Sequence, residues 1–135
     1  MKLSAVLTWN AIIWIAAGIA FAMYGPLMMS LFDIPELNID PLTYWYIAAF
    51  ARLFGAALFS AGLLMFALRR TADQMDERTR RGVVMALLIG SLVCLISSLV
   101  QQSSFWGTPA GWTTSAVFLV FTLLYGAIYI RDRQA

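Results

Sequence analysis

The chain has 135 residues, of which 61% are hydrophobic and only 12% are charged, and its formal net charge is +2. A soluble domain is nearer half apolar and a quarter charged, and one aqueous core of this size cannot hide so much apolar surface, so lipid must cover the excess. The chain has no histidine and one cysteine. It therefore lacks the usual ligand for metals, haem and chlorophyll, and it cannot form an internal disulfide.

The first apolar run covers about residues 3–24. As a helix it would be about 33 Å long, which is enough to cross a bilayer, and Gly25-Pro26 ends it. Ala20-Phe21-Ala22 makes only a weak signal-peptide cleavage site. We expect this run to be a retained span.

Residues 25–42 contain Asp33, Glu36 and Asp40 and no basic residue. The apolar side chains at their start predict a short interfacial helix, and a capped turn is expected at Asp33-Ile34-Pro35-Glu36.

Three further spans are predicted at about residues 43–68, 83–101 and 113–130. The segment between the second and third spans is rich in arginine. In that segment Thr71 and Gln74 form a capping-box pattern, which predicts that the third helix begins near Ala72. Along the same helix, an ion pair is expected between Asp76 and Arg80 or between Glu77 and Arg81. An outer aromatic belt is expected from Tyr44, Trp45, Tyr46, Trp106 and Trp112.

Eight of the nine basic residues lie at the start of the chain, in residues 69–81 or in the tail. Basic residues near span ends stay on the cytoplasmic side, so both termini are expected there. The sequence therefore predicts an all-α fold: a four-transmembrane-helix bundle, N-in and C-in, formed by a single integral membrane domain over residues 1–135.

The ninth basic residue, Arg52, is the one charge inside a predicted span. A charge within a span is a functional-site hypothesis by default. Small residues follow it on one face, so we expect Arg52 to point into the bundle. It would bond there to Gln101, Gln102, Asp33, a backbone carbonyl or a bound ligand. A purely structural role and the capture of an anionic or carbonyl-bearing ligand both remain open.

The third span carries a polar stripe of Gly90, Cys94, Ser97 and Gln101. Such residues commonly hold membrane helices together, and a ligand cavity is the alternative. Trp14, near the middle of the first span, would either pack in the core or stack on a ligand ring. The candidate ligand-binding residues are therefore Arg52, Gln101, Ser97 and Trp14.

The run ARLFGAAL at residues 51–58, Arg80-Arg81, Gln101 and Gly111-Trp112 occur in this order along the chain. In this respect the sequence resembles a family of small bacterial four-helix integral membrane proteins of unknown function. The resemblance extends from about Tyr24 onward. It implies a multi-pass protein of the bacterial inner membrane and implies no activity.

The predicted spans contain no carboxylate, and the sequence has no metal-ligand cluster, phosphate loop or Ser/His/Asp set. We therefore expect a non-catalytic accessory or structural subunit of a larger membrane complex, or a homo-oligomer, in contact with the bilayer and not with nucleic acid. The alternative is a binding or transport module at Arg52 for a lipid, quinone or carotenoid. A small membrane enzyme acting on lipids is the third hypothesis.

Overall fold

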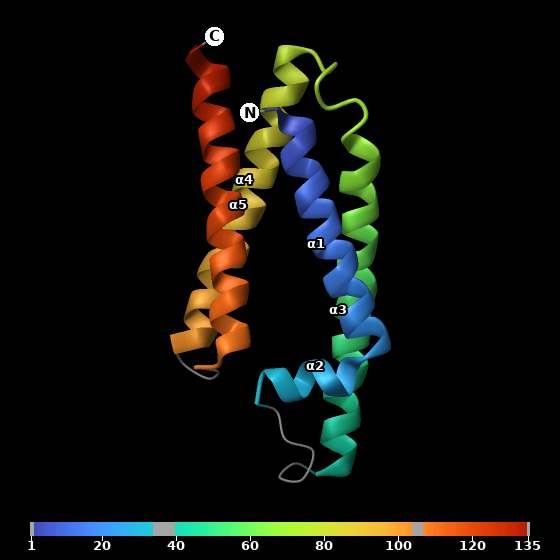
Figure 1. The fold of residues 1–135 in the computed structure, drawn as a ribbon. Helices are drawn as coiled ribbons and strands as arrows, with labels where there is room; N and C mark the ends of the chain where they lie inside the picture. Colours follow the sequence, from blue (N-terminus) through green and yellow to red (C-terminus); the bar gives the residue numbers. More distant parts are fainter. Residues whose placement is uncertain (1, 34–39, 104–106, 135) are drawn as a thin grey trace. The chain divides into compact units, whose positions relative to one another are not determined.

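The computed structural model describes residues 2–33, 40–103 and 107–134. Its regular elements there are all helices: α1 (Leu3–Met23), α2 (Gly25–Leu31), α3 (Pro41–Leu68), α4 (Glu77–Gln101) and α5 (Pro109–Gln134), shown in Figure 1. The four long helices are each long and apolar enough to cross a membrane. They occupy the positions where the sequence predicts spans. The predicted turn at residues 34–36 and Trp106 lie outside the described residues.

Three of the long helices begin at a residue whose side-chain oxygen accepts a backbone N–H three positions later. This contact satisfies one of the N–H groups that a helix start leaves unpaired. The pairs are Asp40 with Thr43 in α3 (3.1 Å), Asp76 with Thr79 in α4 (3.0 Å), and Thr108 with Gly111 in α5 (3.2 Å).

The predicted start of the third long helix near Ala72 is wrong. The Thr71 hydroxyl donates to the carbonyl oxygen of Leu68 at 3.2 Å instead of capping a helix, and α4 begins only at Glu77. The Asp76 carboxylate provides the cap, so it is turned toward the backbone of its own helix.

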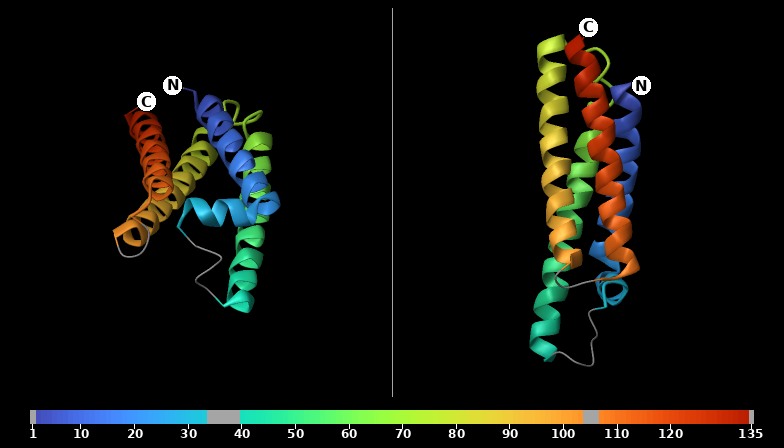
Figure 2. Two further views of the ribbon diagram at one scale, coloured as in Figure 1. Left: turned by 60° about the horizontal axis from the view of Figure 1, so that its bottom comes forward. Right: turned by 90° about the vertical axis from the view of Figure 1, so that its left-hand side faces the viewer.

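The described chain divides into two compact units. One contains residues 1–6 and 68–135, and the other contains residues 7–67. In the first unit, α4 and α5 run antiparallel and lie side by side in all three ribbon views (Figures 1 and 2). Its buried apolar side chains are Leu3, Val6, Ala72, Val84, Leu95, Phe121, Tyr125 and Ile128.

In the second unit, glycines bring α1 and α3 into backbone contact. A Cβ atom added to Gly18 would lie 2.5 Å from the backbone nitrogen of Phe59, and one added to Gly55 would lie 2.5 Å from that of Ala22. Because real Cβ atoms are essentially never that close to backbone atoms, only glycine fits at these two positions.

The α1–α3 register carries α3 past the end of α1. Gly25, just after α1, lies beside Ala48 and Arg52 of α3. Since α3 starts at Pro41, its first turns extend roughly 10–16 Å beyond that level. The short helix α2 packs on this extension through Met29, which forms one buried cluster with Tyr44 and Ala48.

Of the residues predicted for an outer aromatic belt, Tyr44 is therefore buried in the protein. Its ring packs edge-on against the ring of Trp45, with centroids 5.9 Å apart. Trp45, Tyr46 and Trp112 are exposed, as membrane-facing aromatic side chains would be.

Candidate functional site

Arg52, in α3, lies beside the junction between α1 and α2. Its Cγ and Nε atoms would be 3.7 and 4.0 Å from a Cβ atom built on Gly25, so the side chain runs alongside this glycine. The residue is exposed, and no described residue of its own unit accepts a hydrogen bond from it. Among the described residues of this unit, the predicted acceptor Asp33 is thus not used by Arg52.

Trp14 and Arg52 are not brought together. The α3 residue opposite this part of α1 is Gly62, whose added Cβ would lie 2.7 Å from the Ile15 side chain. Gly62 and Arg52 are ten positions apart on α3, which is about 15 Å along the helix. Trp14 therefore sits too far along the hairpin to share a small ligand with Arg52.

Ser97 and Gln101 are both exposed, on the same side of α4 as Gly82, Ala86 and Gly90. An added Cβ on Gly82 or on Gly90 would meet nothing within 4 Å. This side of α4, which we call the open α4 face, is defined by Gly82, Ala86, Gly90, Ser97 and Gln101. It includes Gly90, Ser97 and Gln101 of the predicted polar stripe, and it is not covered by α5.

The neighbouring polar residues Ser98 and Gln102 face α5 instead. The Ser98 and Ser115 hydroxyl oxygens are 2.7 Å apart, and Gln102 Nε2 donates to the carbonyl oxygen of Thr108 at 3.0 Å. The Gln102 side chain crosses directly over Gly111: a Cβ there would collide with Gln102 Oε1 and lie 2.9 Å from Gln102 Cδ. These buried contacts fix one end of the hairpin.

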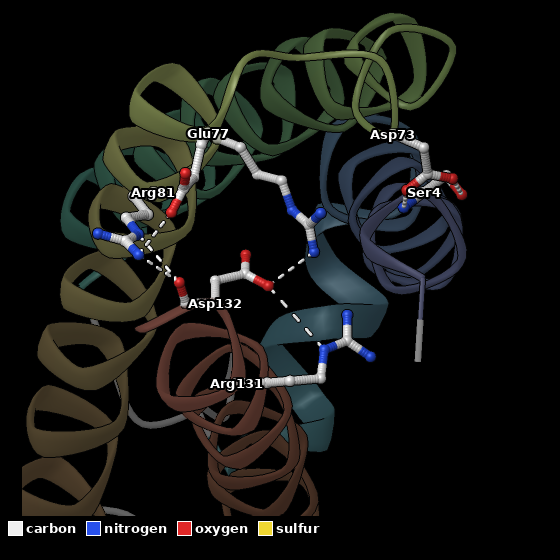
Figure 3. A network of polar contacts seen from close by, with 7 residues as sticks. Ser4, Asp73, Glu77, Arg81, Arg131 and Asp132 are labelled. Atoms are coloured by element: carbon white, nitrogen blue, oxygen red, sulfur yellow. Dashed lines mark hydrogen bonds and ion pairs between the residues drawn. The ribbon is translucent and has the colours of Figure 1, made fainter. Parts of the chain in front are cut away.

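The other end of the hairpin holds a network of charged residues (Figure 3). Arg80 Nη2 donates to Asp132 Oδ1 at 2.8 Å, and Arg131 Nε lies 3.9 Å from the same oxygen. The Asp132 side chain is only 10% exposed. Burying a carboxylate is costly unless cations compensate it, and here two guanidinium groups do so.

Arg81 completes this network from the next position of α4. Its Nε and Nη2 atoms donate to the backbone carbonyl of Asp132 at 3.0 and 2.6 Å. A cation at this point satisfies a carbonyl in the last turn of α5 and favours the negative end of the helix dipole. Arg81 also pairs with Glu77 at 2.6 Å, which confirms one of the two predicted ion pairs.

Asp73, in the segment before α4, caps the start of α1. Both carboxylate oxygens accept from Ser4: one from its hydroxyl at 2.5 Å and one from its backbone N–H at 3.3 Å. The hydrogen bond from the Ser4 hydroxyl is the main cause that lowers the Asp73 pKa from its ordinary value. The positive charges of Lys2 and Arg80 lower this pKa further. This contact ties the first turn of α1 to the segment before α4.

Sequence reasoning missed the role of Asp132. The predicted pair for Arg80 was Asp76, four positions away, but Asp76 caps α4 and Arg80 bonds 52 positions along the chain. One signal was present. Two antiparallel helices bring the start of α4 beside the end of α5, and Asp132 is the one acid in that tail.

No metal-binding group of three or more histidine, cysteine, aspartate or glutamate side chains occurs among the described residues. Neither a family model, nor a curated protein, nor a solved structure matches this chain.

Proposed function

We propose that this chain is a non-catalytic subunit of a larger membrane complex in the inner membrane of a bacterium, with both termini on the cytoplasmic side. The four long apolar helices support the multi-pass membrane location. The resemblance at residues 51–58 supports the bacterial source. The proposal itself rests on the open α4 face.

The glycines on the open α4 face differ in their surroundings from the glycines between α1 and α3. The space beside Gly18 and Gly55 is filled by the backbone of the facing helix, whereas a Cβ added to Gly82 or Gly90 has nothing within 4 Å. Membrane helices associate through small residues that allow close backbone approach, helped by hydroxyl and amide groups. The open α4 face has this composition, with Ser97 and Gln101 as its polar members. A transmembrane helix of a partner subunit would pack against it.

The test is copurification from native membranes in mild detergent. Gly90→Leu should release the partner while α4 and α5 stay packed together, since a Cβ atom added at Gly90 meets no described heavy atom within 4 Å. The matched control is Ala116→Leu, a similar enlargement at an exposed position of α5, and it should keep the partner bound. A chain that purifies alone before any substitution would overturn the proposal.

A second candidate function is binding of a lipophilic or anionic small molecule, such as a lipid, quinone or carotenoid, at Arg52. The exposed Arg52 side chain beside Gly25 favours it. Arg52→Leu should then keep the fold and lose the ligand, and Arg52→Lys should bind it more weakly because lysine lacks a planar fork. Equal amounts of ligand copurifying with the Leu variant and with the unmodified protein would exclude this site.

A further inference from the structure

Arg80 and Arg131 come from the start of α4 and the end of α5, yet both approach Asp132 Oδ1, at 2.8 and 3.9 Å. In Figure 3 the Arg131 side chain lies beside the Asp132 carboxylate. One carboxylate carries one negative charge, while each guanidinium stays protonated and offers five N–H donors. The pair of arginines is therefore held together with positive charge to spare.

Other charges at this end of the unit do not remove the excess. Eight basic and four acidic side chains lie in residues 2, 69–81 and 131–133, an excess of four positive charges. Glu77 is taken up by Arg81, and Asp76 accepts a backbone N–H of its own helix. These two carboxylates are thus engaged away from the Arg80–Asp132–Arg131 cluster.

The position of the two arginines indicates where that anion comes from. The predicted spans of these helices are residues 83–101 and 113–130. Arg80 and Arg131 thus lie one to three residues outside them, within about 5 Å of the hydrocarbon boundary. This is the level of the lipid headgroups.

We propose that Arg80 and Arg131 bind the phosphate group of an anionic phospholipid in the leaflet next to this end of the chain. Arginine recognises phosphate through paired N–H···O bonds that a lysine cannot reproduce. Asp132 acts as a positioning residue: it is 10% exposed and holds Arg80 by a 2.8 Å hydrogen bond. The proposal requires that α4 and α5 cross a membrane, but it does not require a partner subunit.

The experiment measures binding of phosphatidylglycerol to the purified full-length chain in detergent by native mass spectrometry. Arg80→Gln with Arg131→Gln should weaken binding about tenfold, the expected loss for charge-assisted hydrogen bonds. Arg78→Gln with Arg133→Gln removes the same charge from two exposed positions nearby, and it should change binding less than about twofold. Equal losses in the two double variants would show diffuse attraction and overturn the site.

Two further arms separate the ligand source and the fold. Soluble glycerol phosphate should bind much more weakly than phosphatidylglycerol; equal binding would assign the site to a soluble phosphate instead of a lipid. Because Arg80 also holds Asp132, the glutamine variant is checked by circular dichroism. If its helix content falls, Arg80→Lys with Arg131→Lys keeps the charge and decides the question. It should still weaken binding, whereas Arg78→Lys with Arg133→Lys should not.

Discussion

Arg80 bonds to Asp132 across 52 positions of sequence, at 2.8 Å, and so closes the α4–α5 hairpin at the end opposite to its loop. Arg81 bonds to the Asp132 backbone, so two successive residues of α4 hold one residue of α5. This end of the hairpin is fixed by charge, whereas the loop end is fixed by the neutral Ser98–Ser115 and Gln102–Thr108 contacts.

The first prediction concerns this pair. Asp132→Asn should destabilise the hairpin by about 2 kcal/mol, because it leaves a largely buried guanidinium without its anion. Reversible unfolding by detergent exchange, followed by circular dichroism, measures the change. The control is Glu77→Gln, whose partner Arg81 is 41% exposed; it should cost less than about 1 kcal/mol. Similar losses of stability in the two variants would contradict the deeper burial of the Arg80–Asp132 pair.

The second prediction concerns pH. Bonds from Ser4 lower the Asp73 pKa, so folding favours the ionised form. The stability contributed by this contact is present above the ordinary pKa of an aspartate and is lost as the pH falls through the lowered value. Carboxyl-detected NMR should show Asp73 titrating below its ordinary range, and Ser4→Ala should move it back up.

Asp76 provides the internal control for that titration. Its pKa is also lowered, but chiefly by the Thr79 hydroxyl and backbone N–H within its own helix. Its titration should therefore be unaffected by Ser4→Ala. If both aspartates shifted together, a general change in electrostatics would replace the local hydrogen bond as the explanation.

The third prediction compares two glycines. Gly55→Ala places a Cβ 2.5 Å from the Ala22 nitrogen and 2.8 Å from the Gly18 carbonyl oxygen. Backbone atoms cannot rotate away, so the α1–α3 contact should open at a cost of about 1–3 kcal/mol. Gly90→Ala, which meets nothing, should be neutral or up to about 1 kcal/mol stabilising through helix propensity. The same unfolding assay ranks the two, and the opposite order would refute the close contact.

The fourth prediction is a double-mutant cycle at the loop end of the hairpin. Gly111→Ala should be destabilising, because the new methyl group collides with the Gln102 amide, which loses its 3.0 Å bond to Thr108. In a Gln102→Ala background the same glycine substitution should cost little. Additive effects of the two changes would mean that they do not share this contact.

The fifth prediction tests the topology. In a Cys94→Ser background, a cysteine placed at Thr71 should react with a membrane-impermeant reagent only after permeabilisation. One placed at Leu42 should react in intact spheroplasts. Both positions are exposed in the structure, so burial in the protein does not mask either reporter. The reverse pattern would refute the positive-inside argument.

The long helices could be predicted from the sequence because length and hydropathy are properties of single segments. The start of α4 could not. Two capping patterns compete there, at Thr71 and at Asp76, and the outcome depends on contacts from elsewhere. The Thr71 hydroxyl bonds back to Leu68, and Asp73 is occupied by Ser4, 69 positions away. The Asp76 carboxylate therefore caps the helix.

The candidate residues show the same division. Arg52 was singled out by the hydropathy pattern, because a charge in an apolar run is conspicuous, and its role stays a prediction. The pair of polar residues that meets α5 was not predicted: Ser98 and Gln102 face α5, while Ser97 and Gln101 of the predicted stripe do not. Neighbouring residues on a helix are about 100° apart around the axis, so the sequence pattern alone does not show which of two adjacent polar pairs meets the next helix.

The Ser4–Asp73 cap also bears on how the protein is made. The contact joins positions 69 residues apart, so the first turn of α1 is synthesised long before its cap exists. Unpaired N–H groups in that turn must stay in the aqueous or headgroup region until Asp73 leaves the ribosome, because they are costly to place in lipid. The N-terminal turn of α1 is thus expected to reach its final position only after α3 has been inserted.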